Sequence, residues 1–292
     1  MDAPLGQEIG LDWKAAEHDL RTEPALAQTP IPARVWNVWA GGKDGSAVDE
    51  AFGAYVRARC PRIDQLAQAR LDLRARLVRT LVGDYQIEQL LVAGQVDLPL
   101  RDEVHVIAQQ ANPQARVVYA DPDDFVLTYA RALFAPGLEG TCDCVPAALN
   151  DPRGLLASAG RDLDLDRPVG VLLLNSLGGY PDEVAAQVVG HLRESLAPGS
   201  MIAICDLTDI SGHGLTSLDA LREGWFPGLL GVRSPGAIQA LLGGTELVRP
   251  GVVPAPLWRP DPSLLTASPF MDLWCGVGRI RGPRPQRRPR CR

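Results

Sequence analysis

Short apolar segments alternate with helix-like segments over residues 86–209, and this alternation constrains the fold more than any other feature of the sequence. Residues 168–177 and 200–209 are apolar almost throughout, which is typical of strands buried on both faces. Strands separated by helices of about 10–15 residues indicate βαβ units and a mainly parallel sheet with helices on both faces. We therefore predict an α/β fold.

The periodicity of each segment predicts the individual elements. We predict strands at residues 86–94, 115–121, 140–149, 168–177, 200–209, 245–253 and 270–280. Helices are expected at residues 62–83, 102–112, 122–134 and 182–199, the first ending at Gly83. Two short helices joined by the Gly41–Gly42 turn are expected before them.

The chain has 292 residues, which at about 150 residues per domain allows two domains. The pattern instead favours one α/β domain at residues 85–280 with additions at both ends. We predict a flexible lead-in at 1–30, an N-terminal helical arm or lid at 31–84 and a basic, disordered tail at 281–292.

Charge is unevenly distributed along the chain. The net charge is −6, yet residues 279–292 hold seven Arg and no acid. Without that segment, 22 basic and 35 acidic residues leave a net charge of −13. An acidic body is unsuited to coating nucleic acid, so a nucleic-acid contact is expected at most from the basic tail.

The N-terminus lacks the basic and apolar regions of a signal peptide. The longest apolar stretch, Pro168–Tyr180, is shorter than the roughly 20 residues that a membrane span needs. Of the six cysteines only Cys142 and Cys144 are close together, and no further ligand pair accompanies them, so we expect no metal site. These features predict a cytoplasmic protein with free thiols and no membrane partner.

Polar residues or glycine lie at or just after the ends of several predicted strands, at Gly94, Asp121, Asn175 and Asp206. In doubly wound sheets ligands bind outside the carboxyl ends of the strands. A carboxylate at the end of the second strand can accept both hydroxyls of a ribose, which is one interpretation of Asp121. The other interpretation is a capping role on the helix that follows.

The turn after the first strand reads VAGQVDLPL, where a nucleoside site calls for a glycine-rich loop. Gly94 is present, but Val96 and Asp97 stand where a second glycine would let the backbone approach a ligand. The loop therefore resembles a nucleoside-binding turn only in part.

Three other features allow both a functional and a structural interpretation. Lys43 is one of two lysines in an arginine-rich chain, which indicates either a site for a compact ammonium group or a surface position. Trp36 and Trp39 form either a lid over the pocket or ordinary aromatic packing. Of the four histidines, His213 on a glycine-flanked loop is the one expected to reach a site.

Several motifs together resemble a bacterial, actinobacterial-type S-adenosyl methyltransferase family, most of whose members are uncharacterised. They are PIPARVWNVWAGGKD, ARVVYADPDDFVLTYARALF, LNDP, DLDRPVGVLLLNSL, LAPGS and ELVRPGVVPAPLWRPD, in this order over about residues 30–280. The resemblance implies a Rossmann-like, seven-stranded methyltransferase fold with an N-terminal helical extension. It also implies S-adenosylmethionine (SAM) as the ligand, with candidate contacts at Trp36, Gly42, Lys43, Gly94, Asp121 and Pro122.

The sequence departs from the family at the positions expected to contact SAM. Val92 replaces an acid on the first strand, Ala148 replaces an acid expected near the adenine, and Gly178 replaces a histidine. The SAM-binding motif is thus degraded, and Asp97 is the candidate to take over the lost acidic contact. Losing two charge-assisted hydrogen bonds would cost about 3–6 kcal/mol of binding free energy.

Two functions from different classes follow. The first is a SAM-dependent methyltransferase of a small molecule, with secondary metabolism as the expected setting. The family histidine replaced by Gly178 is not essential for this function, because methyl transfer depends mainly on how the methyl group and its acceptor are aligned. The second is a protein of the same fold that no longer methylates, either a cyclase-type catalyst or a binding or regulatory protein. Candidate polar groups for catalysis are Asn175, Tyr180, Asp206 and His213.

Overall fold

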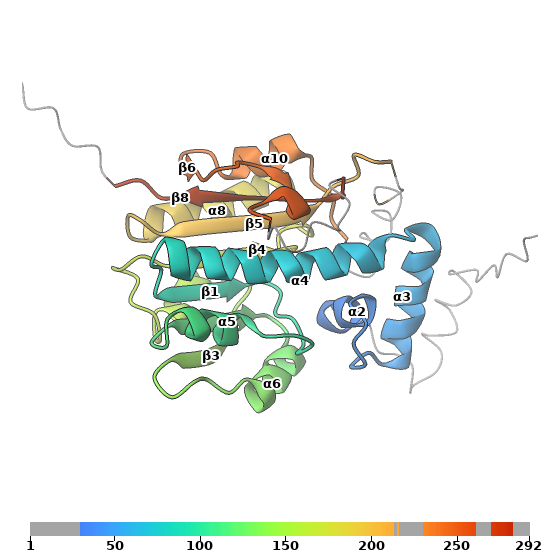
Figure 1. Cartoon of the computed structure of the whole chain (residues 1–292), viewed down its shortest axis with the longest axis horizontal. Helices are drawn as coiled ribbons and strands as arrows, with labels where there is room; N and C mark the ends of the chain where they lie inside the picture. Colours follow the sequence, from blue (N-terminus) through green and yellow to red (C-terminus); the bar gives the residue numbers. More distant parts are fainter. Residues whose placement is uncertain (1–29, 213–214, 216–229, 261–269, 283–292) are drawn as a thin grey trace, which may run out of the picture.

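The computed structural model describes residues 30–212, 215, 230–260 and 270–282. These residues form a sheet flanked by helices, with a helical arm at one end of it (Figure 1). The predictions for the lead-in at 1–29, for His213 and for residues 283–292 of the tail lie outside the described residues.

The sheet follows the order β3-β2-β1-β4-β5-β8-β6, and β7 pairs with β8 beside this path. Neighbours from β3 to β5 are parallel, whereas β8 runs antiparallel to β5, β6 and β7. The strands are β1 (Gln89–Ala93), β2 (Arg116–Asp121), β3 (Thr141–Pro146), β4 (Gly170–Leu174), β5 (Met201–Leu207), β6 (Glu246–Leu247), β7 (Val253–Pro254) and β8 (Leu273–Arg279).

Helices cover the sheet on both faces because successive side chains of each central strand point to opposite sides. Leu90 and Val92 of β1 join an apolar cluster with α4 and α5, whereas Leu91 and Ala93 join a second cluster with α7, α8 and α10. The bounds of these helices are α4 (Ile63–Arg79), α5 (Val104–Ala111), α6 (Asp124–Leu133), α7 (Pro152–Ala159), α8 (Asp182–Ser195) and α10 (Pro235–Leu241).

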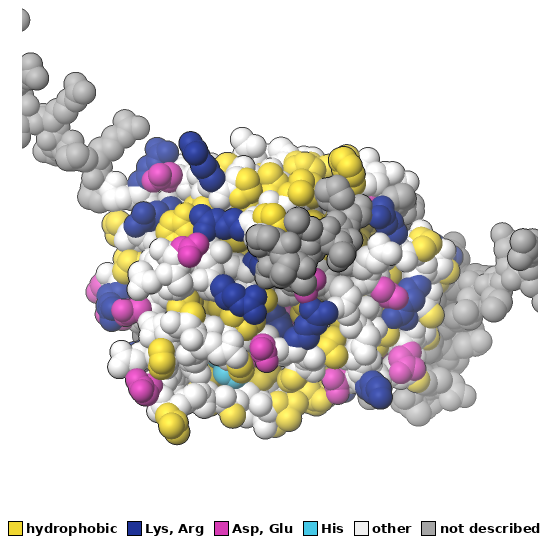
Figure 2. All heavy atoms as spheres, viewed as in Figure 1, with side chains coloured by type: hydrophobic (Ala, Val, Ile, Leu, Met, Phe, Trp, Pro, Cys, Tyr) yellow, Lys and Arg dark blue, Asp and Glu magenta, His cyan; other side chains and the backbone are white. Residues whose placement is uncertain are grey.

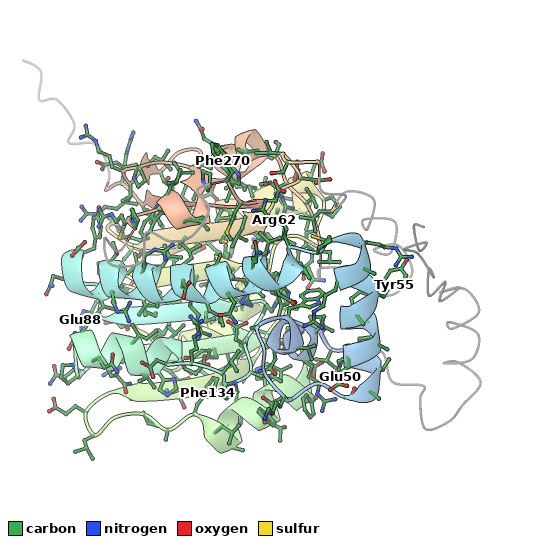
Figure 3. All side chains as sticks on the ribbon, turned by 45° about the vertical axis from the view of Figure 1, so that its right-hand side comes forward. Glu50, Tyr55, Arg62, Glu88, Phe134 and Phe270 are labelled. Atoms are coloured by element: carbon green, nitrogen blue, oxygen red, sulfur yellow. The ribbon has the colours of Figure 1, made fainter. Side chains whose placement is uncertain are left out.

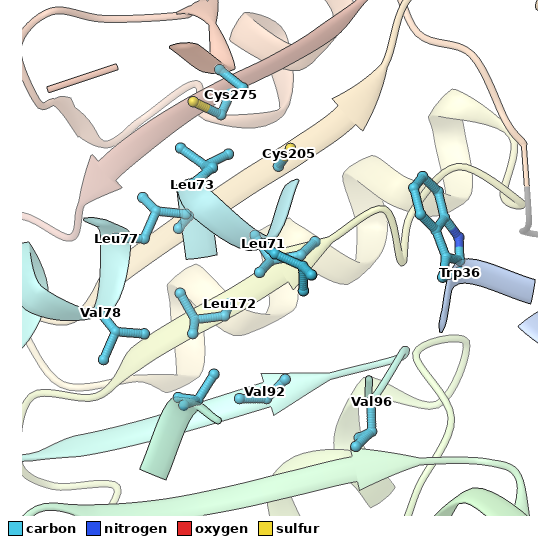
Figure 4. Packing of buried hydrophobic residues seen from close by; sticks show 14 of the residues in the cluster. Trp36, Leu71, Leu73, Leu77, Val78, Val92, Val96, Leu172, Cys205 and Cys275 are labelled. Carbon is cyan, nitrogen blue, oxygen red and sulfur yellow. The ribbon is translucent and has the colours of Figure 1, made fainter. Parts of the chain in front are cut away.

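Helix α4 carries the longest apolar stripe in the described part of the chain. Figure 4 shows Leu73, Leu77 and Val78 of this helix in the same apolar cluster as Val92 of β1 and Leu172 of β4. Leu73 and Leu77 are fully buried, and each contributes about 1.5–3 kcal/mol of transfer free energy. The helix passes into one π-helical turn at Thr80–Asp84, so it ends where Gly83 predicted.

The arm consists of α2 (Pro32–Trp39), α3 (Ala47–Arg59) and α4. Figure 3 shows α3, with Glu50 and Tyr55, crossing the N-terminal end of α4 near Arg62. A capping box begins α3: the Asp49 carboxylate accepts hydrogen bonds from Ser46 N (2.8 Å) and, through its other oxygen, from Ile31 N (2.8 Å). One buried side chain therefore ties the start of α2 to the start of α3.

Basic and acidic side chains of the described residues are interspersed on the face seen in Figure 2. On the protein surface Arg101 pairs with Asp72 (2.5 Å between Nη1 and Oδ1), and both side chains are exposed. Exposed pairs of this kind contribute about 0–1 kcal/mol. None of the described helices combines the length and apolar character that crossing a membrane requires.

The prediction of a mainly parallel α/β sheet is confirmed, and so is the Rossmann-like methyltransferase architecture with an N-terminal helical region. The predicted strand at 245–253 is instead two short strands, β6 and β7, because Pro250 cannot donate to a strand ladder and Gly251 turns the chain at φ +97°. Helices α7 and α10 were missed, since each spans only about two turns and offers few residues over which a helical period can be recognised.

Candidate functional site

A cavity of about 180 Å³ lies at the carboxyl ends of β1, β2 and β4, where the sheet topology predicts a ligand site. Three segments of the sheet and the first turn of α2 contribute to its wall. The lining residues are Ile31, Pro32, Ala33, Gly94, Gln95, Asp121, Pro122, Asp123, Val126, Asn175, Ser176 and Tyr180. The predicted residues Gly94, Asp121, Pro122, Asn175 and Tyr180 are thus brought together.

Gly94 ends β1 with φ +88°, a conformation that a side chain opposes. A Cβ atom there would lie 2.3 Å from Leu149 Cδ1 and 2.9 Å from Ser176 Cβ. Its backbone N–H donates to Ala120 O (2.9 Å), which joins the end of β1 to β2. Glycine is required here by backbone conformation and by space together.

Asp121 is buried at the end of β2 and is held by two backbone donors. Its Oδ2 accepts from Val96 N (2.8 Å) and its Oδ1 accepts from Asp123 N (2.9 Å). Asp123, not Asp121, caps α6, since its carboxylate accepts from Phe125 N and Val126 N. Burial raises the pKa of Asp121 to about 6, against the lowering effect of the hydrogen bonds from Val96 and Asp123. Of the two interpretations of Asp121, the helix cap is therefore wrong.

The loop after β4 supplies the opposite wall. Asn175 has φ +60°, a left-handed conformation that Asn tolerates better than most residues. Asn175 Oδ1 and Ser176 Oγ are buried and have no hydrogen-bond partner among the described residues. Burial and the nearby Asp121 raise the pKa of the half-buried Tyr180, so its hydroxyl stays protonated at neutral pH. Buried polar atoms without partners are costly unless a ligand or water satisfies them.

Trp36 and Asp97 lie beside the cavity rather than in its lining. With its amide oxygen toward them, Gln95 accepts from Trp36 Nε1 (3.1 Å) and from Arg70 Nη2 (3.2 Å). Trp36 packs edge-on against Trp39, with ring centroids 5.2 Å apart, and both rings are buried. Asp97 is paired with arginines of α4. The tryptophans thus pack within the arm, and it is the start of α2 that reaches the cavity.

The Gly41–Gly42–Lys43–Asp44 turn lies outside the cavity lining. A Cβ atom on Gly42 would lie 2.1 Å from Asn37 Oδ1, so this glycine lets the turn close against α2. Asp44 accepts from the Tyr129 hydroxyl (2.7 Å), which connects the turn to α6. The Lys43 side chain is exposed.

Asp206 is fully buried at the end of β5 and also lies outside the lining. It pairs with Arg233 (3.0 Å), which in turn holds Asp182 (2.9 Å) and the carbonyl of Tyr180. Burial raises the pKa of Asp206 to about 7, and Arg233 partly offsets this. The carboxylate therefore helps to fix the loop that carries Tyr180.

Two of the positions at which a departure from the family pattern was expected, Val92 and Gly178, are closely packed. Val92 is buried in the apolar cluster beneath α4, where a carboxylate would need a partner. A Cβ atom on Gly178 would lie 2.9 Å from Gly231 O, so an imidazole at this position requires the two segments to separate.

Five parts of the lining were not predicted from the sequence: Gln95, Asp123, Val126, Ser176 and the Ile31–Ala33 segment. Gln95 and Ser176 each directly follow a predicted site residue, which was the available signal. Nothing in the strand pattern indicated that α2 begins at the cavity. Among the described residues no three His, Cys, Asp or Glu side chains form a group that could hold a metal ion.

Comparison with known proteins identifies the family. A model of the S-adenosyl methyltransferase family matches residues 20–281. The solved structure of a candidate methyltransferase from Thermobifida fusca YX is 34% identical, over 87% of this chain and 96% of that one, with a TM-score of 0.78. A DUF574 family protein from Streptomyces avermitilis MA-4680 is 28% identical, over 89% and 99%, with a TM-score of 0.79. No curated protein matches the sequence. The resemblance seen in the motifs is confirmed: the chain belongs to the S-adenosyl methyltransferase family.

Proposed function

We propose that this protein is a SAM-dependent methyltransferase of a small molecule and that SAM binds in the cavity at the ends of β1, β2 and β4. The observation that carries the proposal is the Asp121 carboxylate, buried at the end of β2 in the same cavity as Gly94. A carboxylate at this point of a doubly wound sheet is suited to the hydroxyls of a ribose. Family membership supports the cofactor.

The polar groups of the cavity suit the adenosine part of SAM. Each Asp121 oxygen accepts one backbone N–H and retains a lone pair for a ligand hydroxyl. Asn175 Oδ1 and Ser176 Oγ are unsatisfied acceptors at the facing wall. The cavity of about 180 Å³ is smaller than the roughly 300 Å³ at which ligand pockets usually begin, so part of SAM must extend beyond its rim.

SAM supplies a methyl group on a positively charged sulfur, whose transfer depends on alignment with the acceptor more than on acid–base help. Asp121 would fix the ribose, and Gly94 keeps the β1 turn close to it. The protonated Tyr180 hydroxyl is a hydrogen-bond donor for the acceptor molecule. The start of α2 forms part of the cavity wall.

The proposal extends to secondary metabolism as the setting and the cytoplasm as the location. The charge of −13 outside residues 279–292 supports a small-molecule substrate over nucleic acid, and any nucleic-acid contact is assigned to the Arg-rich tail. No membrane partner is part of the proposal.

A protein of this fold that binds its ligand without methylation is the second candidate. It is favoured by the titratable side chains that line the cavity, which among the described residues are Asp121, Asp123 and Tyr180. None of these is a histidine or lysine, and Asp121 is already assigned to the ribose and Asp123 caps α6, so the lining offers no further side chain as a base for an acceptor that must lose a proton. A cyclase-type catalyst or a regulatory protein would fit the same observation.

Calorimetric titration with SAM and S-adenosylhomocysteine tests the proposal. The wild type should bind both, and Asp121→Asn should weaken binding at least about tenfold, the effect of one lost charge-assisted hydrogen bond. Asp124→Asn is the matched control, because Asp124 lies exposed on the first turn of α6 outside the cavity. No binding at millimolar ligand would refute the methyltransferase; binding without methyl transfer to any acceptor tried would favour the second candidate.

A further inference from the structure

The turn after β1 is held by ion pairs rather than by a glycine-rich sequence. Arg70 and Arg74 lie one helical turn apart on α4, on the face that meets this turn, and both are almost completely buried. Both guanidinium groups contact one carboxylate, that of Asp97. Arg70 Nη1 lies 2.7 Å from Asp97 Oδ1, and Arg74 Nη1 lies 2.9 Å from Asp97 Oδ2.

The cluster continues on both sides of Asp97. Arg74 also pairs with the buried Glu103 (3.0 Å) and donates to the carbonyl of Asp102 (3.1 Å). Arg70 donates to the amide oxygen of Gln95 and stacks over the Trp36 ring, with Cζ 4.7 Å from the ring centroid. Two guanidinium groups thus face two carboxyl groups inside the protein; burial raises the pKa of Glu103 to about 7, and Arg74 partly offsets this.

Val96 lies between two residues that this cluster holds, Gln95 and Asp97. Its side chain is fully buried, and its backbone N–H donates to Asp121 Oδ2 over 2.8 Å. With its neighbours fixed on either side, the peptide group of Val96 has little freedom to turn. The direction of its N–H, and with it the plane of the Asp121 carboxylate, depends on the ion pairs of Asp97.

We propose that Arg70, Arg74 and Asp97 are positioning residues: they lock the β1 turn so that Val96 N–H orients the Asp121 carboxylate in the ligand cavity. In glycine-rich turns the short backbone itself approaches the ligand. Here the arginines of α4 hold the β1 turn in place of a glycine-rich sequence. The turn then acts on the ligand through the side chain of Asp121 on β2. The link to ligand affinity rests on the proposed function, whereas the orientation of Asp121 does not.

The pKa of Asp121 in the ligand-free protein provides a readout that loss of stability alone would not move. Two effects of Asp97→Asn oppose each other. Removal of the Asp97 charge lowers the pKa of Asp121, whereas loss of the Val96 hydrogen bond raises it, and the hydrogen bond has the larger effect of the two. The other titratable groups around Asp121, Asp123 and Tyr180, are unchanged in this variant.

The experiment is a carbon-13 NMR titration of the aspartate carboxyl groups, with the Asp121 signal assigned through Asp121→Asn. In Asp97→Asn the pKa of Asp121 should rise by about one pH unit, the size of one charge-assisted hydrogen bond. Glu103→Gln is the matched control, because it removes a buried partner of Arg74 without touching the turn, and it should leave this pKa in place. A pKa of Asp121 that falls or stays constant in Asp97→Asn, or rises equally in Glu103→Gln, overturns the proposal.

Arg70→Lys provides a second variant in case Asp97→Asn does not fold. It keeps the charge and loses the two-pronged contact with Asp97, so the pKa of Asp121 should again rise. The affinity for S-adenosylhomocysteine should fall about tenfold in Asp97→Asn and by less than about threefold in Glu103→Gln. If the wild type binds no S-adenosylhomocysteine, the proposed function fails while the NMR titration still decides whether Asp97 positions Asp121.

Discussion

Replacing Gly94 with Ala should destabilise the protein more than any other glycine-to-alanine change of similar backbone conformation. A side chain at φ +88° costs about 1–3 kcal/mol. The new Cβ atom would also lie 2.3 Å from Leu149 Cδ1 and 2.9 Å from Ser176 Cβ, an overpacking that costs about another 1–3 kcal/mol. The expected loss in the free energy of unfolding is therefore about 2–6 kcal/mol.

Gly41→Ala separates the two contributions. Gly41 has the same φ of +88°, but a Cβ atom there would meet nothing within 4 Å. Urea denaturation followed by circular dichroism should show a loss of about 1–3 kcal/mol for Gly41→Ala and clearly more for Gly94→Ala. Equal losses in the two variants would refute the packing part of the argument.

Combining Gly94→Ala with Leu149→Ala tests which neighbour is responsible. Leu149→Ala alone should cost about 2–5 kcal/mol because the side chain is buried. The double variant should lose at least about 1 kcal/mol less than the sum of the single losses, since the smaller residue makes room for the new methyl group. Strict additivity would show that Leu149 does not confine Gly94.

Three further predictions concern the groups around the cavity. Affinity for S-adenosylhomocysteine should strengthen as pH rises through about 6, because the Asp121 carboxylate must ionise to accept hydroxyl groups; calorimetry should find this dependence absent in Asp121→Asn. The stability that Asp121 contributes has the opposite pH dependence: it is complete below the ordinary pKa of 3.8 and is lost as pH rises to about 6. In urea denaturation the free energy of unfolding of Asp121→Asn should therefore vary less with pH over this range than that of the wild type. Arg233→Met should cost about 3–5 kcal/mol by leaving Asp206 buried without its partner, and Arg233→Met with Asp206→Leu should recover much of that loss in the same assay.

The strand pattern predicted the sheet because each central strand is buried on both faces and therefore apolar throughout. The same pattern located Gly94, Asp121 and Asn175, since parallel strands carry their carboxyl ends to one edge. Tyr180 followed from the loop after β4. These inferences needed only local sequence and a general property of α/β sheets.

The rest of the site depends on contacts between distant segments, which a single sequence does not display. Asp97 was expected to replace a lost ligand contact, but it lies between two arginines that precede it by more than twenty residues. Asp206 was expected near the chemistry, and its partner Arg233 is separated from it by 27 positions. The approach of Ile31 to the cavity follows from its hydrogen bond to Asp49 on α3. Each of these placements depends on a contact between residues far apart in the sequence and not on the conformational preference of a short segment.

We expect the ribose of the ligand to bind Asp121 at the end of β2. A crystal structure of the wild type with S-adenosylhomocysteine tests it most directly. Both ribose hydroxyls should lie within about 3 Å of the Asp121 carboxylate oxygens, with the Val96 N–H still donating to Oδ2. An adenosyl group seated elsewhere, or a ribose without contact to Asp121, would contradict it.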